Sequence, residues 1–255
     1  MISLNEFLVN KKIDKKIDQY KYAPLNKDEL RSDIEELLKQ KIYDLNCIDT
    51  SKITDMSYLF AYAKITKQQQ KLIDISNWDV SNVENMSGMF SNCKYMNCNL
   101  SNWNVSKVIN MSSMFSFCSS FEGNGLKDWD VSNVESMKSM FYDCTEFDSN
   151  ISNWNVSKVK NMSSMFSFCH KFNQPLNDWD VSNVENMEHM FMECIEFNKP
   201  LNKWNVGNVK NMSGMFNSAR KFYQNLDSWN VNNVVNKTNI FVKTRMHTLP
   251  KWIIK

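Results

Sequence analysis

Seven tryptophans recur at a nearly constant spacing along this chain of 255 residues. Successive members lie 25 residues apart, except for one interval of 26, and they are Trp78, Trp103, Trp129, Trp154, Trp179, Trp204 and Trp229. A fixed period of about 20 to 50 residues is typical of repeat proteins, in which each unit buries its apolar side against its neighbours. The sequence therefore predicts an elongated stack of similar units.

Apolar residues inside each unit are spaced as on one face of a short helix. Met86, Met89, Phe90 and Cys93 fall at i, i+3, i+4 and i+7, and equivalent residues recur in later units. The residue before this face is usually asparagine, as at Asn85, which is a favoured N-cap residue. This pattern predicts a short helix in every unit.

The segment before each helix has the pattern of a strand. Leu176, Trp179 and Val181 match the leucine-rich-repeat strand L-x-x-L-x-L, with tryptophan in the middle apolar place. Together the two patterns predict an α/β repeat solenoid that is leucine-rich-repeat-like, with about eight coils of 25 residues, each a strand, a turn and a short helix. A degenerate first unit begins at Ile48, and an insertion around residues 67–70 follows it.

Three regions follow from this reading: residues 1–47 as a helical N-terminal cap, 48–241 as the repeat solenoid and 242–255 as a C-terminal cap. Asn26 and Glu29 are placed as a capping box for a helix that runs to about Gln40. An earlier helix is predicted near residues 4–19, and the apolar residues around Trp252 are predicted to plug the far end.

Two columns of equivalent residues are predicted to be structural core. One is the set of seven tryptophans, and the other contains Cys93, Cys118, Cys144, Cys169 and Cys194, each 15 residues after a tryptophan. Ala219 takes the same place in a flanking unit, which indicates a small apolar site that suits a free thiol. No C-x-x-C pair occurs, which disfavours a zinc site or disulfides, so the thiols are expected to be reduced.

The polar residues that follow the tryptophans are predicted to line one exposed face. They are the candidate binding residues Asp79, Asn104, Asp130, Asn155, Asp180, Asn205 and Asn230. The exposed strand face of a repeat stack is a common place for partners to bind. The alternative is that these residues only solvate the surface.

Charge and motifs favour a non-catalytic protein without cofactors. The net charge is +2 and the pI is 8.1, whereas a nucleic-acid-binding domain usually has a pI above about 9 and a clustered basic face. No glycine-rich phosphate loop, G-x-S-x-G or H-E-x-x-H motif occurs, and the three histidines are not at metal-ligand spacing. We therefore expect no enzyme, no metal, no nucleic-acid partner and, since no long apolar run exists, no membrane span.

The repeated motif W-D-V-S-N-V-x-x-M-x-x-M-F-x-x-C-x-x-F-N-x-x-L, seen in full from Trp179 to Leu201, resembles the BspA-like leucine-rich-repeat family of bacterial surface and lipoprotein-associated proteins. The resemblance covers about residues 20–255. It implies a non-catalytic repeat protein that is often exposed at the cell surface and takes part in adhesion or protein binding.

These observations predict a scaffold that binds a protein partner through its Asn/Asp face. The alternatives are a structural element that self-associates and a surface adhesin for host matrix or carbohydrate. The start of the sequence has no export signal and the thiols are predicted to be reduced, which favours a cytoplasmic location, whereas the resemblance implies the cell surface.

Overall fold

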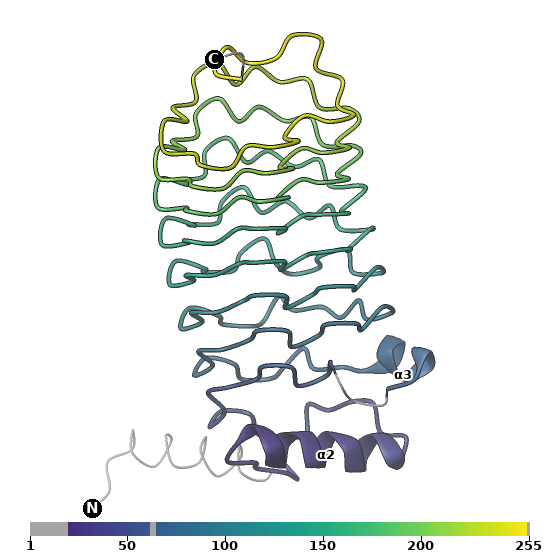
Figure 1. The fold of residues 1–255 in the computed structure, drawn as a ribbon. Helices are drawn as coiled ribbons and strands as arrows, with labels where there is room; N and C mark the ends of the chain where they lie inside the picture. Colours follow the sequence, from purple (N-terminus) through teal and green to yellow (C-terminus); the bar gives the residue numbers. More distant parts are fainter. Residues whose placement is uncertain (1–19, 62–64, 254–255) are drawn as a thin grey trace, which may run out of the picture.

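The chain winds into one stack of coils (Figure 1). The fold is seen in a computed structural model, which describes residues 20–61 and 65–253. Helix α2 (Lys27–Lys39) lies at one end of the stack, helix α3 (Lys67–Leu72) lies beside the first coils, and the C-terminal residues lie at the other end. Single parallel β-bridges join successive coils at equivalent residues: Asp55, Asn85, Asn110, Ser136, Asn161, Asn186, Asn211 and Asn236.

The prediction of an α/β leucine-rich-repeat-like solenoid is wrong. Among the described residues, α2 and α3 are the only helices, and both precede the first tryptophan. Within the part of the chain that the structure describes, no strand is longer than an isolated bridge. The coils from Trp78 onward consist of turns and irregular segments, so they contain neither the predicted strands nor the predicted short helices.

Residues with left-handed backbone conformation prevent the predicted helices. In the coil of Trp78, Gly88 and Asn92 have φ angles of 61° and 66°, and equivalent residues of later coils have similar values. The N–H of Met89 donates to the carbonyl of Met86, and that of Cys93 to Phe90, so the bonds span three residues instead of the four of an α-helix. A positive φ at the third residue is the geometry of a type II turn.

The predicted strand is also a turn. The N–H of Trp179 donates to the carbonyl of Leu176 at 3.1 Å, and the same bond recurs at the other tryptophans.

The asparagines predicted as N-caps have a different role as well. Asn85 Oδ1 accepts from the N–H of Ser87, two residues on, which is an Asx-turn, while its backbone forms the bridge to Asn110.

Alternate backbone groups hold the coils together. In the coil of Trp78, the N–H groups of Met86, Gly88, Phe90 and Asn92 donate to carbonyls of the next coil at 2.8–2.9 Å. Intervening N–H groups close turns within their own coil. The buried backbone is therefore paired without a regular sheet, as buried polar groups require.

Aromatic columns fill the interior. All seven tryptophans of the repeat are 3–5% exposed, and the rings of Trp129 and Trp154 stack with centroids 6.4 Å apart. Each indole Nε1–H donates to a carbonyl of the preceding coil, as from Trp154 to Leu126 at 2.9 Å. A tryptophan at this position therefore supplies both buried apolar area and a bond between coils.

Helix α2 confirms the prediction of a helix that starts after Asn26. Asn26 Oδ1 accepts from the N–H groups of Asp28 and Glu29, and Leu30 and Ile34 are among the residues that the helix buries. Arg31 Nη2 donates to the carbonyl of Tyr58 in the first coil. In later coils the equivalent carbonyl accepts the N–H three residues later in its own coil, as Gly88 accepts from Ser91. Arg31 therefore ties α2 to a carbonyl that closes a turn elsewhere in the stack.

The remaining predictions concern the insertion and the two termini. The insertion after the first unit contains α3, whose N-cap Thr66 forms a capping box with Gln69. Trp252 stacks on Trp229 with a centroid distance of 6.3 Å, which continues the tryptophan column at the far end. The helix predicted near residues 4–19 lies outside the described residues.

Candidate functional site

The candidate binding residues form a row along the stack, one from each of seven coils. This Asn/Asp row consists of Asp79, Asn104, Asp130, Asn155, Asp180, Asn205 and Asn230, and all are exposed except the half-buried Asp79. In each of them Oδ1 accepts the backbone N–H two residues later at 3.0–3.2 Å. The row therefore has a structural role in every coil, because each residue closes an Asx-turn.

The Asx-turns do not engage the whole of an asparagine side chain. Within the described residues, Asn155 uses only Oδ1 in its turn, so its amide nitrogen is available to a partner. Hydrogen bonds from Ser132 lower the pKa of Asp130, which keeps this carboxylate ionised. The row thus presents polar groups in fixed positions on a rigid backbone.

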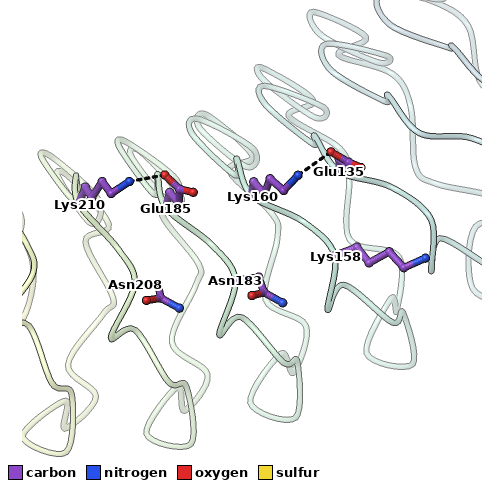
Figure 2. Close-up of a pocket in the computed structure, with 7 residues that line it drawn as sticks. All are labelled: Glu135, Lys158, Lys160, Asn183, Glu185, Asn208 and Lys210. Atoms are coloured by element: carbon purple, nitrogen blue, oxygen red, sulfur yellow. Dashed lines mark hydrogen bonds and ion pairs between the residues drawn. The ribbon is translucent and has the colours of Figure 1, made fainter.

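One shallow depression of about 550 Å³ spans several coils. Its lining residues follow those of the Asn/Asp row by a few positions in the sequence of each coil. Figure 2 shows the residues that line it, which are Glu135, Lys158, Lys160, Asn183, Glu185, Asn208 and Lys210. They come from four successive coils and fall into two columns. We name these the Glu/Lys column and the Asn/Lys column.

The Glu/Lys column contains the sixth residue after each tryptophan: Glu84, Ile109, Glu135, Lys160, Glu185, Lys210 and Val235. Lys160 pairs with Glu135 at 2.8 Å and Lys210 with Glu185 at 2.5 Å. The hydrogen bond that each lysine donates lowers the pKa of its glutamate, and donation to Glu135 raises the pKa of Lys160. The four side chains are solvent-exposed, so each pair contributes little to stability.

The Asn/Lys column contains the fourth residue after each tryptophan: Asn82, Lys107, Asn133, Lys158, Asn183, Asn208 and Asn233. Each asparagine donates its Nδ2 to a carbonyl of the preceding coil, as from Asn183 to Ser157 at 2.7 Å. Lys158 Nζ in turn donates to Asn133 Oδ1 at 2.7 Å.

The alternation in this column stops at Asn208, where the pattern of earlier coils predicts a lysine. Within the described residues, the Oδ1 atoms of Asn183 and Asn208 consequently receive no hydrogen bond, unlike that of Asn133. Sequence reasoning did not identify this column as part of a site. The signal was present in the asparagine that replaces a lysine at position 208.

The cysteine column lies in the core and is chemically quiet. Cys144 Sγ donates to the carbonyl of Phe115 at 2.9 Å, and the other four thiols make the equivalent bond to the coil before. Burial raises the pKa of Cys93 to about 12 and raises those of the other four as well. The thiols therefore stay protonated, which makes them hydrogen-bond donors and poor nucleophiles.

We expect the column cysteines to resist thiol reagents in the native protein. A pKa near 12 lowers the thiolate fraction near neutral pH by roughly 10³ relative to an ordinary cysteine. Cys47, which is half-buried and outside the column, should react first. Mass spectrometry of partly labelled native protein should find the label on Cys47, and all seven cysteines should react in denaturant. Labelling of Cys144 as fast as Cys47 would contradict this arrangement.

Within residues 20–61 and 65–253, no group of three His, Cys, Asp or Glu side chains is placed to hold a metal ion. No helix in this part of the chain is long and apolar enough to cross a membrane.

Comparison with known proteins gives a family but no activity. A family model described as "Mycoplasma protein of unknown function, DUF285" matches the chain twice, over residues 29–151 and 136–252. No curated protein and no solved structure matches it. The two matches together extend from α2 to Trp252 and so cover the whole stack. The chain therefore belongs to the DUF285 family of Mycoplasma proteins of unknown function.

Proposed function

We propose that this chain is a non-catalytic scaffold that binds a protein partner through the Asn/Asp row. The observation that carries the proposal is the repetition of one exposed polar side chain in each coil, fixed by the same backbone hydrogen bond. A rigid row loses little conformational entropy when it binds, which favours affinity. The similarity to BspA-like proteins, and the surface role that it implies, stays a prediction.

The spacing of the row suits an extended partner. Successive coils are joined by parallel bridges, so neighbouring residues of the row are expected about 4.8 Å apart. Asp and Asn alternate along most of the row, which offers acceptors and donors in turn. A protein segment that lies along the stack with its own polar groups would match this pattern, whereas a compact small molecule would contact only one or two coils.

The test replaces three asparagines of the row. The variant Asn104→Lys, Asn155→Lys and Asn205→Lys removes three Asx-turn bonds and adds three positive charges. A partner captured from cell lysate by the wild-type protein should be lost with this variant, because the long lysine side chains block the row.

A matched control changes three asparagines at the fourth residue before a tryptophan. Asn99, Asn150 and Asn225 are also exposed and also close Asx-turns, so their replacement by lysine has the same effect on charge and on turn geometry. We expect this control to capture the partner as the wild type does. Equal recovery by both variants would place binding elsewhere, and loss with both would attribute it to charge or stability.

A further inference from the structure

The Glu/Lys column contains two exposed aliphatic side chains. Ile109 and Val235 are 45% and 89% exposed, and they occupy the position that holds charged residues in the four coils between them. Single exposed aliphatic residues are common on protein surfaces. These two, however, lie in one column, on either side of four residues that alternate in charge. The six side chains therefore form one continuous pattern along the stack.

Six consecutive members of the column are complementary to their own reverse. After Glu84 the column reads apolar, acidic, basic, acidic, basic and apolar, the members being Ile109, Glu135, Lys160, Glu185, Lys210 and Val235. In the opposite order, each acidic position becomes basic, each basic position becomes acidic, and the apolar ends exchange. Two copies of this run placed antiparallel would therefore match at six levels, and Glu84 would lie one level beyond the second copy's Val235.

Backbone hydrogen bonds fix the position of each member of this column relative to the members in the neighbouring coils. The N–H of each member donates to the carbonyl of the member before it at 2.8–2.9 Å, from Glu135 to Ile109 through to Val235 to Lys210. The residues are thus held in register, one to each coil. Because all coils repeat the same spacing, two copies of the column have the same period and stay matched from Ile109 to Val235.

We propose that two copies of this chain associate side by side and antiparallel through the Glu/Lys column. The two-fold axis lies in the plane of the contact, at right angles to the long axis of the stack. It passes midway between the levels of Lys160 and Glu185. It places Lys160 beside the second copy's Glu185, Glu135 beside the second copy's Lys210, and Ile109 beside the second copy's Val235. Such an isologous contact uses one surface of each copy, as most homodimers do.

The neighbouring Asn/Lys column supports the same axis independently. This axis keeps each column opposite its own counterpart, and it brings Lys158 to the level of the second copy's Asn183. Asn183 Oδ1 receives no hydrogen bond within the described chain, whereas Asn133 Oδ1 receives one from Lys158. An ammonium group has three donors, so Lys158 can bind Asn133 and the second copy's Asn183 together.

Other arrangements match less well. A parallel pair of copies would place each residue of the column beside its own counterpart, so like charges would meet at every charged level, which is unfavourable. Neighbour pairing within one chain explains the alternation of Glu and Lys. It does not explain the exposed Ile109 and Val235 or the unoccupied acceptor of Asn183.

The expected interface is small. Six coils at about 4.8 Å each span roughly 24 Å, which is short for a stable dimer interface. Exposed ion pairs also contribute little individually and weaken in salt. We therefore expect a weak dimer that dissociates on dilution and at high ionic strength. Sedimentation or light scattering across a range of concentrations should show the mass rise from 30.0 kDa toward twice that value.

Charge reversal provides the sharpest test. The variants K160E/K210E and E135K/E185K each give four like charges between Ile109 and Val235, so each alone should remain monomeric at concentrations where the wild type dimerises. A mixture of the two should recover the dimer, because opposite columns then meet. Circular dichroism on each variant alone checks that the coils still fold. A wild type that stays at 30.0 kDa at every concentration would overturn the proposal, as would a mixture that stays monomeric.

Two further variants test the apolar ends and the direction of pairing. I109D should weaken the dimer, whereas L72D, which changes an equally exposed aliphatic residue on α3, should not. A short bis-maleimide should join I109C of one copy to V235C of another. Crosslinks between two copies of I109C without the mixed product would instead indicate a parallel dimer. This inference does not rest on the partner proposed for the Asn/Asp row, so the lysine variants of that row leave it separately testable.

Discussion

Replacing Trp154 with alanine should lower the free energy of unfolding by about 3–5 kcal/mol, the range for truncating a buried aromatic residue. The indole is 3% exposed and packs between Trp129 and the ring of Phe141. The variant also loses the bond from Nε1 to the carbonyl of Leu126 in the preceding coil, worth about 1 kcal/mol. Denaturant unfolding followed by circular dichroism measures the change.

Trp154→Phe is the matched control, because it keeps a stacked ring and removes the N–H donor. We expect a loss of about 1–2 kcal/mol for this variant, since most of the aromatic packing remains. The difference between the two variants separates packing from the bond between coils. Unchanged stability in Trp154→Ala would mean that the tryptophan column does not hold the stack together.

Replacing Gly125 with alanine should also destabilise the stack strongly, by about 2–5 kcal/mol. Gly125 has a φ of 89° and lies in the one unit with an extra residue. A Cβ atom there would lie 2.3 Å from the backbone nitrogen of Ser101 and 2.7 Å from the carbonyl carbon of Leu100. Backbone atoms of the preceding coil cannot move aside as a flexible side chain can, so the coils would have to separate locally.

Gly207→Ala provides the comparison. Gly207 lies in a regular unit, and a Cβ atom there would approach only the exposed side chain of Asn205, at 3.1 Å. We expect a change in unfolding free energy within about 1 kcal/mol, as for most surface substitutions. Thermal unfolding of both variants tests this contrast. Similar midpoints for Gly125→Ala and the wild type would show that the longer unit tolerates a wider separation of its coils.

The repeat and its buried columns could be predicted from the sequence, but the backbone of the coil could not. Met86, Met89, Phe90 and Cys93 are all buried, as a helical face would bury them. The same spacing of three, one and three residues also fits a chain of turns that close every three residues. A left-handed residue such as Ser113 carries no sequence signal comparable to glycine, so the two backbones cannot be separated by periodicity alone.

The candidate site could likewise be predicted from the sequence only in part. The Asn/Asp row could be located because Asp130, Asn155 and their equivalents alternate with buried residues in the sequence. That Oδ1 of each side chain closes a turn depends on backbone geometry, and the unoccupied acceptor of Asn183 depends on which residue the next coil places above it. Such contacts between units require the packing of the stack, which a single unit does not contain.

The near-identity of the coils also affects how the chain finds its correct register during folding. If one unit looped out, the next would dock in its place with the same tryptophan, methionine and phenylalanine contacts, so apolar packing discriminates little against the error. The alternating charges do discriminate, because a slip of one unit would place Glu135 next to Glu185 and remove the pair with Lys160. A slip of two units keeps the alternation. The longer unit with Gly125 and the insertion that carries α3 then mark unique positions along an otherwise repetitive chain.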